Sequence, residues 1–193
     1  KVGAARRAAA PKLAAEVEGR LAALAMPQAT LQIEVGEEDP GDRVEFRLAA
    51  NPGIDPAPLQ RAASGGELSR VLLALRLVLS GGPDTMVFDE VDAGIGGATA
   101  LEVGRALAEV AEGSQVLVVT HLAQVAAHAD QQVRIAKSIG EEATTTTVEP
   151  VDGEARLAEL ARMLSGTPDS TATRSNAEER LARASRPAVA ERH

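Results

Sequence analysis

The sequence predicts an α/β fold in which a mainly parallel sheet is flanked by helices, with a coiled-coil stub at its N-terminal end. Three observations support this class. Two short apolar runs, at 85–89 and 116–119, suit strands buried on both faces. A helical pattern at 98–112 lies between them, and strand–helix–strand units of about 30 residues connect parallel strands. Leucine and valine repeat at helical spacing in residues 1–26.

Composition excludes several classes of protein. The 193 residues are 45% hydrophobic, which suffices for one ordinary domain with an appendage. Cysteine is absent, so disulfides and thiolate metal sites are excluded. The net charge of -8 argues against a surface built to bind nucleic acid throughout. No run approaches the ~20 apolar residues of a membrane span, so we expect a cytoplasmic protein with no membrane partner.

The first helix is expected over residues 1–26, and Met26-Pro27 ends it. Its apolar residues follow the spacing of a coiled-coil seam, although so short a repeat also fits an ordinary amphipathic helix. These residues are Leu13, Val17, Leu21 and Leu24. Because the chain opens with Lys1, we expect a segment of a longer protein, with this helix as the returning end of a longer coiled coil.

The next segment predicts a hairpin and then a loop. Residues 31–35 and 43–48 nearly alternate between apolar and polar and flank a polar turn, which is typical of paired strands. The acidic tip, Glu37-Glu38-Asp39, is expected to be solvated. Three prolines and a glycine predict a loop at 51–58.

Residues 65–79 predict a helix that is apolar almost all round, so we expect it to be deeply buried. A turn leads from it to the strand at 85–89, and a glycine-rich loop at 92–97 leads to the helix at 98–112. Further elements are expected in the C-terminal part. They are a helix at 122–128, strands at 131–137 and 144–147, and helices at 153–164 and 173–185.

Ser64-Gly65-Gly66-Glu67 stands where the helix at 65–79 begins. Glycine lets the backbone approach a ligand closely, and the N–H groups and positive dipole at a helix N-terminus suit a phosphate. An ordinary serine cap has the same appearance, so these residues become informative only together with others. Arg70, one turn further along, supports such a site or lies on the surface, and both alternatives remain open.

Asp89 and Glu90 end the apolar strand at 85–89. Two adjacent acids at a strand tip point in different directions, which suits two different tasks. Carboxylates there can hold Mg²⁺ and position water for attack on a phosphoryl group. The alternative is that they are simply acidic residues leaving a strand.

Four motifs in order resemble those of ABC-type ATPases. Ser64-Gly65-Gly66-Glu67 resembles the signature motif, and Met86-Val87-Phe88-Asp89-Glu90 resembles the Walker B strand. Val91-Asp92-Ala93-Gly94 follows where those proteins carry the D-loop, and Val118-Val119-Thr120-His121 resembles the strand that ends in the switch histidine. One such motif is weak support, whereas four in the right order are strong.

The wording of the motifs resembles one family in particular. Residues 64–70, 88–97 and 120–130 are similar to RecN, the family of bacterial SMC-like ATPases of recombinational double-strand-break repair. Residues 160–166 resemble the closing helix of that family. The resemblance covers about residues 30–185 and implies the C-terminal lobe of a P-loop NTPase-like ABC/SMC head.

The resemblance implies how ATP is bound. Ser64 and the amides of Gly65 and Gly66 would grip the γ-phosphate of an ATP held on the P-loop of a second subunit, and Glu67 belongs to the same motif. Two ATP-bound heads would therefore form a homodimer. Asp92 would lie in the D-loop that crosses the dimer interface.

The resemblance also implies the catalytic group. Asp89 would hold Mg²⁺ through a water molecule, and Glu90 would orient and deprotonate the attacking water. His121 would contact the γ-phosphate and help to place Glu90. ATP and Mg²⁺ are the expected cofactors.

One required motif is missing. The sequence contains no Gly-x-x-x-x-Gly-Lys-[Ser/Thr], and the Lys137-Ser138 pair has no glycine-rich turn before it. In the RecN family the P-loop lies in the N-terminal half. We therefore expect this chain to need an N-terminal P-loop lobe as its partner and to be inactive as an ATP hydrolase by itself.

The expected organisation has three parts. Residues 1–27 end a coiled-coil arm, 28–186 form the C-terminal lobe of the head, and 187–193 form a disordered or added tail. The implied role is repair of DNA double-strand ends by a bacterial, nucleoid-associated protein. Two alternatives stay open: the head of another SMC-like chromosome-structuring ATPase or of an ABC transporter, and a non-catalytic interaction module without a P-loop.

Overall fold

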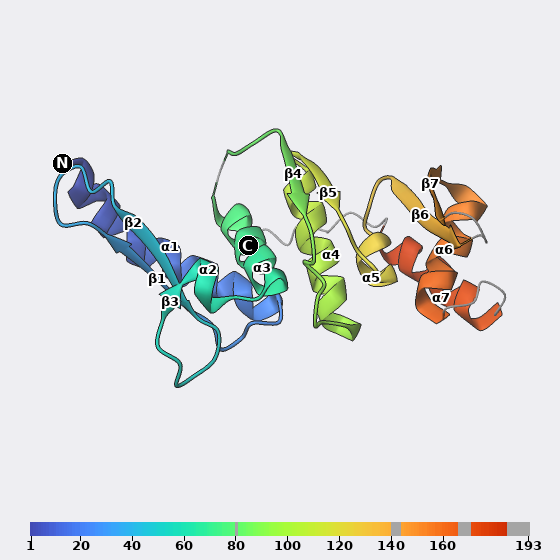
Figure 1. Ribbon diagram of the computed structural model, residues 1–193, viewed down its shortest axis with the longest axis horizontal. Helices are drawn as coiled ribbons and strands as arrows, with labels where there is room; N and C mark the ends of the chain where they lie inside the picture. Colours follow the sequence, from blue (N-terminus) through green and yellow to red (C-terminus); the bar gives the residue numbers. More distant parts are fainter. Residues whose placement is uncertain (80, 140–143, 166–170, 185–193) are drawn as a thin grey trace, which may run out of the picture. The chain divides into compact units, whose positions relative to one another are not determined.

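The computed structural model describes residues 1–79, 81–139, 144–165 and 171–184. The chain forms two compact units, Lys1–Val119 and Thr120–His193 (Figure 1). The first unit contains α1 (Val2–Ala23), β1 (Thr30–Val35), β2 (Val44–Ala49), β3 (Ala57–Pro58), α2 (Leu59–Ala62), α3 (Gly65–Val78), β4 (Thr85–Phe88), α4 (Gly97–Ala111) and β5 (Gln115–Val118). The second contains α5 (Ala123–Ala126), β6 (Gln132–Ile139), β7 (Thr144–Val151), α6 (Gly153–Ser165) and α7 (Thr171–Ala184). The predicted tail at 187–193 lies outside the described residues.

The first helix packs along β1 and against α3 within the first unit (Figure 1). Three of its four predicted seam residues, Val17, Leu21 and Leu24, are buried. Ala10 and Ala14 extend the same buried stripe at helical spacing. The apolar repeat therefore covers this unit's own sheet, and a coiled-coil arm at 1–27 stays a prediction.

The predicted hairpin is confirmed. The β1 and β2 strands pair antiparallel, from Thr30 opposite Ala49 to Val35 opposite Val44. A third strand, β3, pairs with β2 at its far side. The loop prediction for 51–58 is therefore wrong for Ala57 and Pro58, because proline is tolerated on an edge strand that needs no N–H donor.

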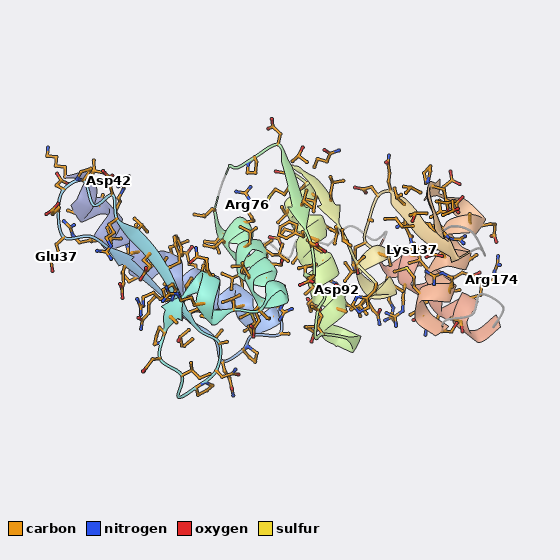
Figure 2. The ribbon with its side chains drawn as sticks, viewed as in Figure 1. Glu37, Asp42, Arg76, Asp92, Lys137 and Arg174 are labelled. Atoms are coloured by element: carbon orange, nitrogen blue, oxygen red, sulfur yellow. The ribbon has the colours of Figure 1, made fainter. Side chains whose placement is uncertain are left out.

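The acidic hairpin tip is exposed, as predicted, and it also contacts the start of α1. The Asp39 carboxylate accepts hydrogen bonds from the amino terminus at 2.8 Å and from the backbone N–H of Gly3 at 2.7 Å. Arg6 donates to the Asp42 carboxylate at 2.9 Å. Figure 2 shows Glu37 and Asp42 on this tip. The acids thus serve as partners for helix N–H groups and for a cation.

The β4–α4–β5 unit is the parallel crossover that the sequence predicts. Met86 pairs with Val116 and Phe88 with Val118 in parallel register. Met86 and Phe88 are buried, whereas Val87 and Leu117, which are partners on the opposite face, are 62% and 50% exposed. The expectation of a mainly parallel sheet therefore holds only for this pair, because the two other described sheets, β1–β2–β3 and β6–β7, are antiparallel.

The α3 helix has one covered face and one open face, so the prediction of a helix buried all round is wrong. Val71, Leu73 and Ala74 are buried, whereas Leu68 and Leu72 are 39% and 44% exposed. Periodicity shows which residues are apolar, but it does not show which of them the surrounding elements cover.

The second unit is a β6–β7 hairpin with three helices. Its core lies among α5, α6 and α7 and contains Ala123, Leu157, Leu160 and Ala177. The predicted elements at 131–137, 144–147, 153–164 and 173–185 correspond to β6, β7, α6 and α7. None of the described helices is long and apolar enough to cross a membrane.

Candidate functional site

The first turn of α3 is shaped by a reciprocal cap. The backbone N–H of Glu67 donates to Ser64 Oγ at 3.4 Å, and the Ser64 backbone N–H donates to Glu67 Oε2 at 2.8 Å. This capping box fixes the entry into the helix and satisfies two of the donors at this end. Gly65 and Gly66 follow directly in the first turn, where backbone N–H groups have no partner within the helix. The structure therefore shows a capped helix N-terminus at Ser64–Glu67, and the binding of an anion there stays a prediction.

The loop that follows β4 carries the acidic candidates. Asp89 and Glu90 are exposed, whereas Asp92 is only 2% exposed. The Glu90 carbonyl accepts from the Ala93 N–H at 2.9 Å, which closes a tight turn. Glu90 has a φ of 56°, a left-handed conformation that costs free energy in any residue with a side chain. The turn changes the direction of the chain directly after Asp89.

The structure brings the helix N-terminus and the acidic loop into contact. The Ser69 hydroxyl, in the second turn of α3, donates to the Asp89 carbonyl at 2.7 Å. A methyl group added at Gly66 would lie 2.9 Å from the Glu90 carbonyl oxygen and 2.9 Å from Ala93 Cβ. A methyl group added at Gly65 would clash with the Glu90 carboxylate. The loop therefore requires glycine at Gly66, whereas at Gly65 the atom in the way belongs to the end of a flexible side chain that can move aside.

The side chain of Arg70 also joins α3 to the acidic loop after β4. Its side chain is only 5% exposed, and its guanidinium donates to the carbonyls of Val91 at 3.3 Å and Ala93 at 3.0 Å. Burial lowers the pKa of Arg70 from its ordinary value, and the negative charge of Glu67 opposes that shift. Of the two alternatives left open by the sequence, a surface position is wrong because Arg70 is buried against the acidic loop, and support of an ATP site stays a prediction.

His121 belongs to the second unit, whereas the other candidates belong to the first. Its side chain is exposed. The preceding Thr120 accepts a hydrogen bond from the Leu122 N–H at 3.0 Å, which shapes the entry into α5. At the other end of α5, Arg156 donates to the carbonyls of Ala126 and Ala127, each at 3.3 Å. Hydrogen bonds therefore hold both ends of α5, the short helix that begins two residues after His121.

The donor set at the acidic loop fits Mg²⁺ only in part. Within the part of the chain that the structure describes, no three His, Asp or Glu side chains gather into a metal site. Asp89 can offer one exposed carboxylate at a strand tip. Magnesium keeps several waters and is often held by one or two carboxylates plus substrate phosphates. These residues fit such a shared site and do not form a protein-only one.

Two residues of this arrangement were not identified as site residues from the sequence. Ser69 gave no signal beyond its place in the motif. Arg70 did give one, because residues four apart share a helix face and Gly66 lies one turn before it. A small residue and a long cation on one face indicate a backbone packed closely against that face.

Curated proteins are similar in sequence to this chain along most of its length. It is 45% identical to the DNA repair protein RecN of Streptomyces coelicolor over 196 aligned positions, which cover 92% of this chain and 34% of the relative. It is 48% identical to RecN of Deinococcus radiodurans, covering 79% of this chain and 25% of the relative. The chain belongs to the RecN family. It spans about a third of the length of the first of these relatives. A comparison with family models finds no match.

Solved structures show the fold of this RecN segment. An SMC head domain with a coiled coil and joint from Pyrococcus yayanosii matches with a TM-score of 0.57 at 22% identity, covering 79% of this chain and 29% of that one. An SMC ATPase from work on ATP-driven dimerization matches with a TM-score of 0.51 at 20% identity, covering 86% and 98%. The predicted fold class, the C-terminal lobe of an ABC/SMC-type head, is thereby confirmed.

Proposed function

We propose that this chain is the C-terminal lobe of the ATPase head of a RecN-type protein that repairs DNA double-strand breaks. The observation that carries the proposal is the contact between the capped N-terminus of α3 and the acidic loop after β4. The capped helix end contacts the loop that carries the two exposed carboxylates, through the Ser69 hydrogen bond and the close packing at Gly66. The names of the relatives support the repair role.

Each residue has a distinct task in this proposal. Ser64 and the amides of Gly65 and Gly66 bind the γ-phosphate of an ATP presented by a second head, with Glu67 holding the cap. Glu90 orients the attacking water and accepts its proton. Asp92 lies in the D-loop at the dimer interface. When bound beside Asp89, Mg²⁺ would offset the negative charge of the phosphates.

His121 completes the proposed set. An exposed imidazole can contact a phosphate oxygen. We expect His121→Ala to reduce turnover without reducing the affinity for ATP by more than about threefold, since the loss falls on a group used in the chemical step. Equal losses in affinity and turnover would assign His121 to binding alone.

The P-loop must come from an N-terminal lobe, because this sequence has no glycine-rich phosphate loop. The exposed face of β4 and β5 supports such a partner. Val87 and Leu117 are partners on the two strands and are 62% and 50% exposed, and Val119, directly after β5, is 59% exposed. Apolar residues grouped in this way mark a surface that another polypeptide covers. The N-terminal lobe of the same protein is the proposed occupant.

The proposed test uses a full-length RecN protein that carries this chain as its C-terminal part. Glu90→Gln keeps the shape of the side chain but removes the base, so ATP should hold two heads together without being consumed. Sedimentation should show an ATP-dependent dimer for Glu90→Gln and transient association for the wild type. Glu112→Gln, an exposed residue at the end of α4, is the matched control and should behave as wild type.

The alternative of a non-catalytic interaction module makes the opposite prediction. In that case Glu90→Gln would change neither ATP turnover nor association. The association expected with ATP would then be absent in Glu90→Gln and in the wild type.

For the whole protein we also propose binding of DNA ends, localisation to the nucleoid and homodimerisation through the heads. These proposals rest on membership of the RecN family.

A further inference from the structure

The Arg70 guanidinium is a buried cation for which the proposed chemistry has no use. The side chain comes from the second turn of α3 and is only 5% exposed. Its Nη1 donates to two carbonyl oxygens of the acidic loop, those of Val91 and Ala93, while its buried Nε has no hydrogen-bond partner. Burying a charge in this way is costly unless its hydrogen bonds are well used.

The two carbonyls flank Asp92 and directly follow Glu90. Carbonyl oxygens in a turn normally accept hydrogen bonds from water, but here both accept from a guanidinium on another element. The guanidinium is planar and remains charged, so it fixes direction as well as distance. The position of the loop is therefore set by α3 and not by β4 alone.

The remaining contacts join the same two elements on the outer side. Ser69 Oγ bonds to the Asp89 carbonyl, and the backbone at Gly66 packs against the Glu90 carbonyl. Arg70 bonds further along the loop, at Val91 and Ala93. The loop is thus attached to α3 before and after Glu90, and the helix and the loop form one body.

We propose that Arg70 is a positioning residue that makes the phosphate-binding turn of α3 and the Asp89–Asp92 loop move together. The inference rests on the proposed function, in which α3 of one head serves one ATP while its acidic loop serves the other. When a phosphate binds to α3 at one ATP site, Arg70 would then make the loop move with the helix and change the orientation of Glu90 at the second site. No contact between Arg70 and substrate is required.

The test compares three variants in a full-length RecN protein. Arg70→Gln removes the cation, and Arg70→Lys keeps the charge without the planar fork. Arg76→Gln is the control, because Arg76 lies on the same helix but bonds to the Gly81 carbonyl at its far end (Figure 2). For each we would measure kcat and KM for ATP, the Hill coefficient, and amide hydrogen exchange at residues 89–94.

Arg70→Gln should lower kcat by about 10- to 100-fold, since small misplacements of a reacting group have effects of this size, and KM should stay within about threefold. The Hill coefficient should fall toward 1, and exchange at 89–94 should speed up. In a Glu90→Gln background the ATP-bound dimer should still form, because the Ser64 cap is intact. Arg70→Lys should be intermediate, and Arg76→Gln should match the wild type.

Two results would overturn the inference. Unchanged kcat and unchanged exchange in Arg70→Gln would reduce Arg70 to packing. Loss of the ATP-bound dimer together with turnover, in Arg70→Lys as well, would place its action on phosphate binding and not on the loop. Failure of the proposed function is recognised separately, because Glu90→Gln would then leave ATP turnover unchanged. Hydrogen exchange at residues 89–94 would still show whether Arg70 attaches the loop to α3.

Discussion

The hydroxyl of Ser69 donates a hydrogen bond to the carbonyl oxygen of Asp89 over 2.7 Å. This bond ties the second turn of α3 to the last residue before the left-handed Glu90. A strained residue persists only when its surroundings hold it in place. Ser69 is therefore part of what holds the backbone of the acidic loop in this conformation.

Ser69→Ala should lower the free energy of unfolding by about 1 kcal/mol, the usual contribution of one such bond. Urea unfolding of the chain measures this difference. Ser114→Ala is the control, because its hydroxyl donates to the Pro83 carbonyl at 3.1 Å away from the acidic loop. Faster amide exchange at 89–93 in Ser69→Ala but not in Ser114→Ala is the specific sign expected. Equal exchange in both would show that Ser69 does not restrain the loop.

Gly66→Ala and Gly19→Ala should change stability in opposite directions. Both glycines lie within helices, where alanine is normally favoured by about 1 kcal/mol. At Gly19 nothing lies within 4 Å of an added methyl group, so we expect stabilisation. At Gly66 the methyl group would lie 2.9 Å from both Ala93 Cβ and the Glu90 carbonyl, so we expect destabilisation. Thermal melting of the two variants checks the signs, and stabilisation by Gly66→Ala would refute the close packing.

Asp39 should make stability depend on acid pH. In the isolated 193-residue polypeptide, the free amino group of Lys1 and then the Gly3 N–H hold the pKa of Asp39 below its ordinary value of 3.8. A lowered pKa in the folded state means that the stabilisation is present above the unfolded value and is lost as the pH falls through the folded value. Wild type should be more stable than Asp39→Asn at pH 7, and the two should converge near pH 2. A difference that stays constant across this range would contradict the assignment.

Arg156→Ala should destabilise the second unit by about 1 to 3 kcal/mol, because carbonyls at the end of α5 lose a charged donor. Burial lowers the pKa of Arg156, with Asp130 opposing it. Arg183→Ala is the control, since Arg183 pairs with Glu179 on the exposed surface of α7 and this variant should change stability by less than about 0.5 kcal/mol. Guanidinium chloride unfolding compares them, and equal effects would remove the special role of Arg156.

Local patterns in the sequence predicted most of the elements. Alternation identified the β1–β2 hairpin, and the apolar runs around 98–112 identified β4 and β5. The serine-glycine start of α3 is a local signal, and the capping box at Ser64 and Glu67 confirms the predicted helix start. Such features depend on neighbours in the chain, so a single sequence contains them.

Contacts between distant residues were not predictable in the same way. The burial of Arg70 depends on a loop some twenty positions further along the chain, and the open face at Leu68 depends on which elements lie nearby. The bonds from the Asp39 carboxylate to the start of α1 are equally distant in sequence. Periodicity identifies a helix face but not what covers it.

The most direct test of the account is ATP turnover by residues 1–193 alone and after co-folding with the P-loop half of the same protein, each with and without Glu90→Gln. We expect turnover only in the combined protein, and we expect Glu90→Gln to abolish it. Turnover that is absent from the combined protein, or that is unchanged by Glu90→Gln, would contradict the assignment of this chain as half of an ATPase head.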